Sequence, residues 1–260
     1  MNRGRKMNEL IDHIYVLKLK RNDTEELEGH LAERFPDVPV RWYEVDGVGF
    51  SVKNEGKMSL SVWGIMQHRH MDDVSRDILR NMISMIREAH GRGLERVLFL
   101  EEDVYFEPFT LGSQTMAWLK ENQSWDAFYF GYCSWPWPVA FYARREVVRV
   151  WSPLLCHAYM LHRRGMEKLL AFTADGTRNM DRHIDKMIST LPGMRKYARF
   201  PMVAFQKKDP ALFVKGCDRL GIRVSLRTVS RWLQYVSIVL PVVIVLLVCV
   251  LLVRWIFSFV

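Results

Sequence analysis

Three consecutive carboxylates follow a short apolar run near the middle of the chain. Residues 97–100 are apolar, and Glu101, Glu102 and Asp103 come directly after them. In an open α/β sheet, ligands bind just outside the carboxyl ends of the strands. Carboxylate oxygens suit Mg²⁺ or Mn²⁺, and these ions commonly bridge to substrate phosphates. The segment therefore predicts a divalent-cation site, and an exposed acidic turn without a ligand is the alternative.

A second pair of carboxylates, Asp181 and Asp185, is spaced four residues apart in a predicted helix over residues 180–191. Residues at this spacing share one helix face. Paired carboxylates there would provide a metal ligand or a general base. The alternative is a solvated helix surface on which the two carboxylates pair with Arg182 or Lys186.

Two further sites belong to the same predicted edge of the sheet. One is Asp126 together with the loop after Gly131, and the other is His157 and Tyr159 at the start of a predicted strand. We expect these residues to meet the acidic triplet at the carboxyl ends of the strands, because ligand sites of open α/β sheets lie there.

The elements that must position these residues follow from the apolar periodicity. Helical spacing and cap signals predict helices over residues 25–35, 72–90, 111–121, 164–172 and 180–191. Short apolar runs predict strands over residues 11–19, 40–45, 96–100, 127–131, 147–151, 157–161 and 197–205, the last of them interrupted by Pro201. Strands that alternate with helices predict an α/β fold, an open mixed and mostly parallel sheet flanked by helices.

The C-terminal part of the chain is strongly apolar. Residues 236–253 contain no charge, and Trp232, Tyr235 and Trp255 flank them. About 20 apolar residues cross the hydrocarbon core of a bilayer as a helix, and aromatic side chains mark its interfaces. The sequence therefore predicts a transmembrane helix over residues 236–258, with a buried core helix as the alternative.

Basic residues precede this apolar run and contribute to a net charge of +8. Arg219, Arg223, Arg227 and Arg231 recur every four residues, which predicts a basic amphipathic helix on the membrane surface within residues 207–235. A solvated helix between domain and anchor is the alternative. The positive-inside rule then predicts a single-pass protein with a C-terminal anchor and a cytosolic domain. No nucleic-acid-binding motif is present, so the charge does not predict a nucleic-acid partner.

The order of motifs over most of residues 11–206 resembles glycosyltransferase family 25, the family of lipopolysaccharide-type and collagen galactosyltransferases. Each motif alone is weak, but together and in this order they are specific. They are I-Y-V-L-K-L-K-R at 14–21, Y-E-V-D-G at 43–47, L-F-L-E-E-D-V at 98–104, W-D-A-F-Y-F-G-Y at 125–132, H-A-Y-M-L-H-R-R-G-M-E-K-L-L at 157–170, D-R-H-I-D at 181–185 and P-M-V-A-F-Q at 201–206.

The resemblance implies a GT-A fold, a UDP-linked sugar donor and a Mn²⁺ or Mg²⁺ ion. The family's L-E-D-D segment corresponds by position to Leu100–Asp103, which implies metal ligation by Asp103 and Glu101. The residues implied to contact the donor are Glu101, Glu102, Asp103, His157 and Tyr159.

The same resemblance implies a catalytic base, either Asp181 or Asp185. In a displacement of this kind a basic residue would assist the phosphates, and Arg163, Arg164 and Lys168 are the candidates. The family's Gly-rich segment ending in Ser-His is matched only loosely by residues 63–70, where His68 or His70 would stand for the histidine.

The chain is therefore expected to contain a glycosyltransferase-like domain over residues 1–206, a juxtamembrane segment over 207–235 and the membrane helix. The predicted reaction is metal-dependent transfer of a hexose, galactose or glucose, from a nucleotide sugar to an acceptor hydroxyl. The acceptor is a glycan, a lipid or a protein. The alternative is a non-catalytic GT-A-like domain that serves as a membrane-tethered binding or scaffold protein.

Overall fold

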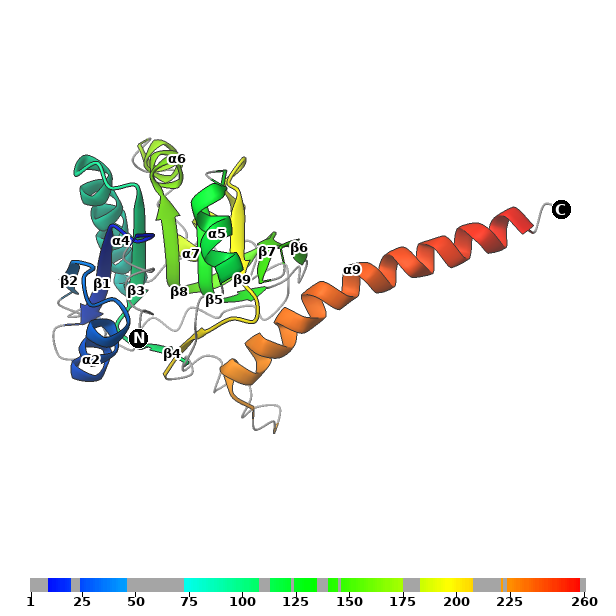
Figure 1. Ribbon diagram of the computed structural model, residues 1–260, viewed down its shortest axis with the longest axis horizontal. Helices are drawn as coiled ribbons and strands as arrows, with labels where there is room; N and C mark the ends of the chain where they lie inside the picture. Colours follow the sequence, from blue (N-terminus) through cyan, green and yellow to red (C-terminus); the bar gives the residue numbers. More distant parts are fainter. Residues whose placement is uncertain are drawn as a thin grey trace.

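A mixed β-sheet with helices on both faces forms the body of the protein, and one long helix leaves it (Figure 1). The computed structural model describes residues 9–19, 24–45, 73–107, 113–122, 124–134, 140–144, 146–174, 183–207, 221 and 224–257.

Within these described residues, eight strands form one sheet in the order β2-β1-β3-β8-β5-β9-β7-β6, and β10 and β4 form a two-stranded ribbon. The strands of the large sheet are β1 (His13–Leu19), β2 (Val40–Val45), β3 (Arg96–Glu101), β5 (Ala127–Ser134), β6 (Ala140–Arg144), β7 (Val147–Val150), β8 (Pro153–His162) and β9 (Lys196–Arg199). The ribbon consists of β4 (Val104–Phe106) and β10 (Ala204–Gln206).

The predicted α/β fold with a mixed sheet is confirmed, but fewer strand pairs are parallel than we expected. β1 pairs in parallel with β2 and β3, and β5 with β9, whereas the other neighbours in the sheet are antiparallel. Parallel neighbours need a long crossover that is usually a helix. β6, β7 and β8 follow one another without such a helix, so β8 enters the centre of the sheet in the antiparallel direction.

Two hydrophobic layers cover the two faces of the sheet. One layer packs α4, α6 and α7 against the sheet, and the other packs α2 and α5 against it. β3 is buried from Val97 to Leu100, because it contributes side chains to both layers. These helices are α2 (Glu25–Arg34), α4 (Asp73–Gly91), α5 (Ser113–Glu121), α6 (Arg163–Thr173) and α7 (Ile184–Thr190).

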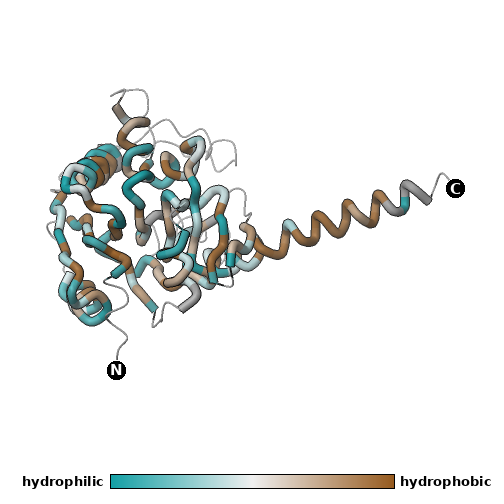
Figure 2. The backbone as a smooth tube through the Cα atoms, turned by 45° about the horizontal axis from the view of Figure 1, so that its top comes forward, coloured by the Kyte–Doolittle hydropathy of each residue, from teal (hydrophilic) through white to brown (hydrophobic). Residues whose placement is uncertain are grey.

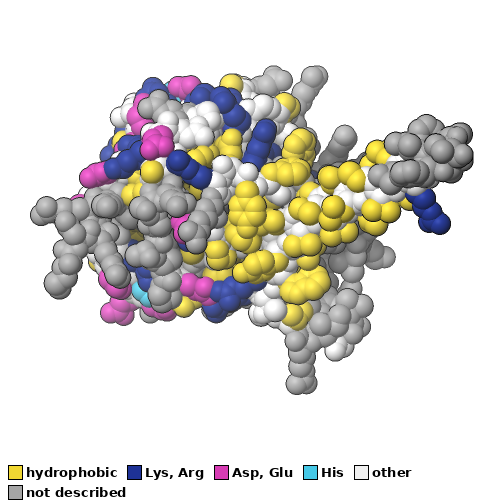
Figure 3. Space-filling view, turned by 45° about the vertical axis from the view of Figure 1, so that its right-hand side comes forward, with side chains coloured by type: hydrophobic (Ala, Val, Ile, Leu, Met, Phe, Trp, Pro, Cys, Tyr) yellow, Lys and Arg dark blue, Asp and Glu magenta, His cyan; other side chains and the backbone are white. Residues whose placement is uncertain are grey.

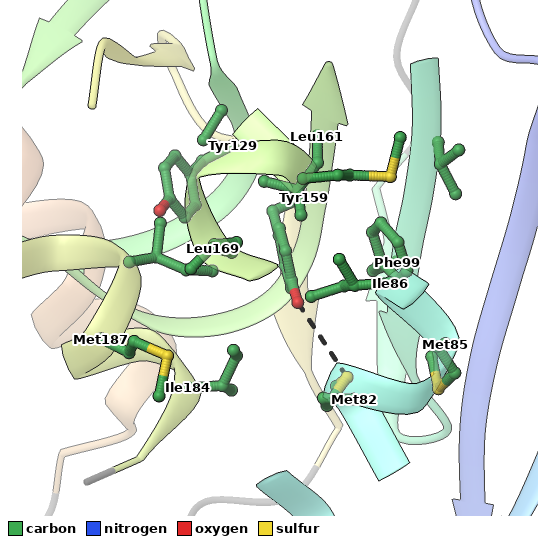
Figure 4. Close-up of a cluster of buried hydrophobic side chains, with 14 of the residues drawn as sticks. Met82, Met85, Ile86, Phe99, Tyr129, Tyr159, Leu161, Leu169, Ile184 and Met187 are labelled. Carbon is green, nitrogen blue, oxygen red and sulfur yellow. Dashed lines mark hydrogen bonds between the residues drawn. The ribbon is translucent and has the colours of Figure 1, made fainter. Parts of the chain in front are cut away.

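Tyr159 belongs to a row of stacked aromatic rings in the first layer. Its ring centroid lies 5.6 Å from that of Phe99 and 6.1 Å from that of Tyr129, and Phe99 stacks in turn on Tyr15 at 5.8 Å. The hydroxyl of Tyr159 points toward the Sδ atom of Met82, 4.0 Å away (Figure 4). Tyr159 has no exposed surface. The expectation that it contacts a sugar donor is therefore corrected, since the register of β8 places it in the core.

The C-terminal apolar segment forms part of one continuous helix, α9 (Leu226–Phe257). Within the described residues, α9 is the one helix that is long and apolar enough to cross a membrane, over Arg227–Leu252. Its residues from 242 to 252 are all exposed. Figure 2 shows this hydrophobic part projecting away from the domain.

The first turns of α9 are fixed to the domain by a buried polar side chain. The Oε1 atom of Gln234 accepts a hydrogen bond from the backbone N–H of Met202 at 3.0 Å. Its Nε2 atom donates to the Tyr132 hydroxyl and to the Arg199 carbonyl, each at 3.3 Å. Gln234 is 1% exposed, so these bonds form where water does not compete. The helix therefore leaves the domain in a defined direction.

Two arginines of the predicted surface helix face the domain. Arg227 and Arg231 both pair with Glu107, and their guanidinium groups lie over the ring of Phe205, at 5.1 and 4.9 Å from its centroid. These two arginines therefore contact the domain, and the basic amphipathic surface helix within residues 207–235 stays a prediction. Their partner follows β4 in the chain, which sequence periodicity did not predict as a strand.

Candidate functional site

The candidate site lies where the two-stranded ribbon crosses the carboxyl end of β3. Glu101 is the last residue of β3, and Gln206 is the last residue of β10. The antiparallel pairing sets Gln206 opposite Val104 and hence beside the acidic triplet. The Nε2 atom of Gln206 donates a hydrogen bond to the Oε2 atom of Glu101 at 3.2 Å. The backbone N–H of Lys207 donates to the carbonyl of Asp103 at 2.8 Å, which fixes the turn that carries Asp103.

Glu102 is held by the end of β1. Its backbone N–H donates to the Leu17 carbonyl at 3.0 Å, and its Oε2 atom accepts from the N–H of Leu19 at 2.7 Å. Glu102 therefore ties the triplet to the neighbouring strand. This contact gives the middle acid of the triplet a positioning role, while Glu101 and Asp103 flank it.

The carboxylates of the site are close enough to perturb one another. Burial raises the pKa of Glu101 to about 8, and the negative charges of Asp103, Asp185 and Glu102 contribute to the rise, against the hydrogen bond from Gln206. Burial also raises the pKa of Asp103, with a contribution from Glu102, although Gln206 and Lys207 oppose the shift. Charges of one sign in a partly buried site are the usual environment of a bound cation.

Asp185 comes to this site from a separate element. It lies in the first turn of α7, and its Oδ1 atom accepts a hydrogen bond from the N–H of Lys186 at 2.6 Å. Its negative charge contributes to the raised pKa of Glu101. Asp181, His68 and His70 lie outside the described residues. The roles of Asp181 and Asp185 stay predictions.

His157 is also near the site, but it is buried and makes a structural contact. Its Nε2 atom lies 3.0 Å from the Ala204 carbonyl, and the side chain is 5% exposed. A Cβ atom on Gly131 would lie 2.2 Å from both partners, so only glycine allows this close approach. His157 thus joins β8 to β10, the strand that carries Gln206. A donor contact of His157 stays a prediction.

Asp126 lies at the opposite end of the strands from the acidic triplet. It precedes β5, and β5 runs in the same direction as β3 because both pair antiparallel with β8. Arg164 and Lys168 bind its carboxylate at 2.6 and 2.7 Å, and the N–H of Arg195 donates to it at 2.7 Å. The expectation that Asp126, Arg164 and Lys168 serve the acidic site is therefore corrected. They form a separate ion cluster around the buried carboxylate of Asp126.

Arg163 is the third basic residue considered for the phosphates. It also lies at the end of the strands opposite to the acidic triplet. Its Nε atom is 3.3 Å from Glu167, and its Nη1 atom is 4.0 Å from Glu95. It begins α6, whose first residues lie at the end of β8 opposite to the acidic site. No phosphate-binding role at the acidic site follows for Arg163.

The oxygen donors of the site fit a hard divalent cation in their chemistry. Within the part of the chain that the structure describes, no group of three or more His, Cys, Asp or Glu side chains is arranged to hold a metal. The buried Oε1 atom of Gln206, however, has no hydrogen-bond partner among the described residues. A buried amide oxygen without a partner costs free energy, and a cation beside it would remove that cost. The sequence analysis missed Gln206 as a site residue, because the motif at residues 201–206 that contains it was given no ligand-binding or catalytic role.

We predict that Glu101→Gln stabilises the protein increasingly as pH rises, in the presence of a chelator. The raised pKa means that Glu101 stays neutral in the folded chain up to about pH 8, whereas in the unfolded chain it ionises above about pH 4.5. The free energy of unfolding therefore falls as the pH rises from about 4.5 to about 8. Glutamine is neutral throughout and still accepts from Gln206. Melting temperatures of the full chain in detergent should agree near pH 5 and differ most near pH 9. Glu121→Gln on exposed α5 is the control, and a constant difference for Glu101→Gln would contradict the prediction.

Comparison with known proteins gives similarity to solved structures. No protein-family model matches the chain, and no curated protein matches it. The A197 protein from STIV is 16% identical, with a TM-score of 0.38, and the match covers 76% of this chain and 86% of that one. A glycosyltransferase involved in the glycosylation of the major capsid of PBCV-1 is 12% identical, with a TM-score of 0.39, over 81% of this chain and 100% of that one. Mannose-1-phosphate geranyltransferase from Thermus thermophilus is 9% identical, with a TM-score of 0.37, over 74% and 75%.

Proposed function

We propose that this chain is a membrane-anchored glycosyltransferase that moves a hexose from a UDP-sugar to an acceptor hydroxyl with the help of a divalent cation. The observation that carries the proposal is the meeting of Glu101, Asp103 and Gln206 at the carboxyl end of β3. The ordered motifs that resemble glycosyltransferase family 25 support it, because two of them supply these three residues.

Asp103, Glu101 and the Oε1 atom of Gln206 would hold the cation. Burial and the repulsion between neighbouring carboxylates raise the pKa of both acids, and Gln206 adds a buried neutral oxygen. Oxygen ligands of this kind suit Mn²⁺ and Mg²⁺. When bound, such an ion neutralises the diphosphate that leaves with UDP.

The acceptor hydroxyl needs a base, and Asp185 is the described candidate. Its carboxylate lies near Glu101, at the start of α7, and a carboxylate can take the proton of an attacking hydroxyl. Asp181, on the same motif, is the other candidate. Transfer to the hydroxyl breaks the bond between the sugar's anomeric carbon and the diphosphate, which leaves as UDP.

The apolar part of α9 would anchor the domain. Its exposed apolar length matches the thickness of a bilayer, and the basic residues on its N-terminal side favour a cytosolic domain. The acceptor would then be a lipid, a glycan or a protein that the cytosolic face can present.

A thermal-shift panel on the full chain in detergent tests the donor site. UDP-galactose, UDP-glucose and UDP should each be measured with Mn²⁺ and with a chelator. Saturating ligand at about 100 times its Kd adds about 2.7 kcal/mol, which shifts the melting temperature by several degrees. We expect a Mn²⁺-dependent shift with one UDP-sugar.

The absence of any shift in a folded sample would contradict the proposal. It would favour the second candidate, a non-catalytic domain that holds a partner at the membrane. The close contacts of Glu102 with β1 and of His157 with β10 suit that candidate, because they give two motif residues structural roles.

A further inference from the structure

The edge of the sheet beside α9 carries aromatic side chains that the proposed reaction does not use. Phe141 and Tyr142 of β6 are 53% and 55% exposed, although β6 is a strand of the main sheet. Tyr235 of α9 is 53% exposed and Trp232 is 71% exposed. Figure 3 shows hydrophobic side chains gathered over the region from which α9 leaves the domain, continuous with those of the helix.

Three aromatic rings on this surface, those of Tyr142, Phe200 and Tyr235, form one connected row. The ring of Tyr142 meets the ring of Phe200 edge-on at 5.7 Å, and Phe200 meets Tyr235 edge-on at 5.3 Å. We call Tyr142, Phe200, Trp232 and Tyr235 the aromatic collar. The collar links the edge strand to the helix, so β6 and α9 present a single surface.

The position of the collar along α9 is fixed by the helix itself. Ile238 still packs against the core of the domain, whereas Val239 is 57% exposed. The domain therefore reaches two or three residues into the apolar run that begins at Val236, about 4 Å along the axis. Gln234 and Tyr235 hold this register through their contacts with Met202 and Phe200.

The collar lies at the N-terminal end of the apolar part of α9. Residues 236–253 span about 27 Å as a helix, close to the hydrocarbon core of about 30 Å. If α9 crosses a membrane along this run, one interface falls at the collar. Tyr and Trp favour this zone, since their rings combine an apolar body with a polar group.

The opposite face of the same edge carries a cation beside Phe141, because neighbouring residues of a strand point to opposite faces and the pairing sets Val148, not Arg149, beside Tyr142. Arg149 of β7 lies opposite Phe141 in the antiparallel pair, and its side chain is exposed. An arginine beside an exposed aromatic residue suits a layer of anionic lipid headgroups. β6 is the last strand of the sheet among the described residues, and its outer edge would lie in the same interface.

We propose that β6 and the aromatic collar rest in the interface of the same bilayer that α9 crosses, so that the domain lies flat against the membrane. The inference rests on the anchor of the proposed function and is independent of its sugar chemistry. The occupant of the surface is lipid rather than a second protein.

The test places a fluorophore on the surface in the full chain. Tyr142→Cys is introduced after Cys156, Cys217 and Cys249 are replaced by serine. Cys133 is buried and escapes labelling. The protein is reconstituted into vesicles of phosphatidylcholine and phosphatidylglycerol, with and without lipids spin-labelled near the headgroup. Phe141→Cys provides a second labelled position on the same strand.

Two matched positions calibrate the result. Glu33→Cys is exposed on α2, on the far side of the domain from α9 (Figures 1 and 2), and Val245→Cys lies in the exposed apolar part of α9. We expect the spin-labelled lipids to quench labels at positions 141 and 142 at least about twofold more than the label at position 33.

Equal quenching at positions 33, 141 and 142, with strong quenching by acyl-chain spin labels at 245, would overturn the proposal while leaving the anchor intact. A label at position 142 whose emission is blue-shifted, is not quenched by the lipids and changes with the protein-to-lipid ratio would also overturn the proposal. It would indicate that the surface contacts a second protein molecule. If position 245 is not quenched either, the anchor and this inference both fail, while nucleotide binding in detergent still reports separately on the sugar chemistry.

Discussion

Replacing Asp103 by asparagine is expected to lower the rate of sugar transfer from the preferred UDP-sugar by about 100-fold or more. Asparagine keeps the volume of the side chain but removes one negative charge from the proposed cation site. The backbone bond from Lys207 that fixes the turn at Asp103 is unaffected. The measurement is turnover of the full chain at saturating donor over a range of Mn²⁺ concentrations, with the Mn²⁺-dependent thermal shift as a second readout.

Asp77→Asn is the matched control for this change. Asp77 lies on the exposed side of α4, where it pairs with Arg80 at 3.2 Å. The control should keep both turnover and the Mn²⁺-dependent shift. Unchanged turnover in Asp103→Asn, at every Mn²⁺ concentration, would remove the cation from the proposal.

Replacing Asp126 by asparagine should have the largest effect on stability. Its carboxylate is fully buried and accepts hydrogen bonds from Arg164, Lys168 and the backbone of Arg195. Removing one member of a buried ion cluster leaves the other charges without compensation and typically costs about 3–5 kcal/mol. Because Arg164 and Lys168 are about one-third exposed, we expect about 3 kcal/mol, or roughly 10 °C in melting temperature.

The same cluster makes a prediction about pH. Burial alone would raise the pKa of Asp126, but the hydrogen bonds from Lys168, the Arg195 backbone and Arg164 outweigh burial and lower it. The carboxylate therefore contributes stability above its ordinary pKa, and this contribution is lost as pH falls through the lowered value. The difference in melting temperature between wild type and Asp126→Asn should shrink below about pH 4. A difference that persists unchanged in acid would show that the cost comes from packing instead.

Gly165 explains why the cluster forms where it does. A Cβ atom at this position would lie 2.2 Å from the Asp126 carbonyl, so the start of α6 can approach β5 only with glycine. The close approach brings Arg164 and Lys168, one on either side of Gly165 in α6, to the same carboxylate. Asp126, Arg164 and Lys168 therefore act as one structural unit at the end of the strands opposite to the candidate site.

Local sequence patterns were sufficient for most helices and strands. The periodicity of Ile78, Met82, Met85 and Ile86 predicted a helix that the structure confirms as α4, and the apolar run at residues 97–100 predicted β3. In both cases the side chains that reveal the element are those that it buries. The short ribbon strand β4 and the edge strand β6 were missed, since β4 has only three residues and β6 is exposed over its last four.

The predicted strand over residues 197–205 shows where local pattern fails. It divides into β9, which belongs to the large sheet, and β10, which pairs with β4. Pro201 lies between them and has no N–H to donate to a ladder, so a single continuous strand was not possible. The division is what carries Gln206 to Glu101, a contact between residues that are 105 positions apart.

The sequence by itself determined the acidic triplet, the elements that precede and follow it, and the long apolar helix, because each is encoded by neighbouring residues. Only the tertiary structure decided which charges share a site. It brought Asp185 and Gln206 to Glu101, held Arg164 and Lys168 at Asp126, and turned Arg227 toward Glu107. The reason is physical: a charge interacts with what lies within a few ångströms of it, and strand order and direction, not chain position, set those distances.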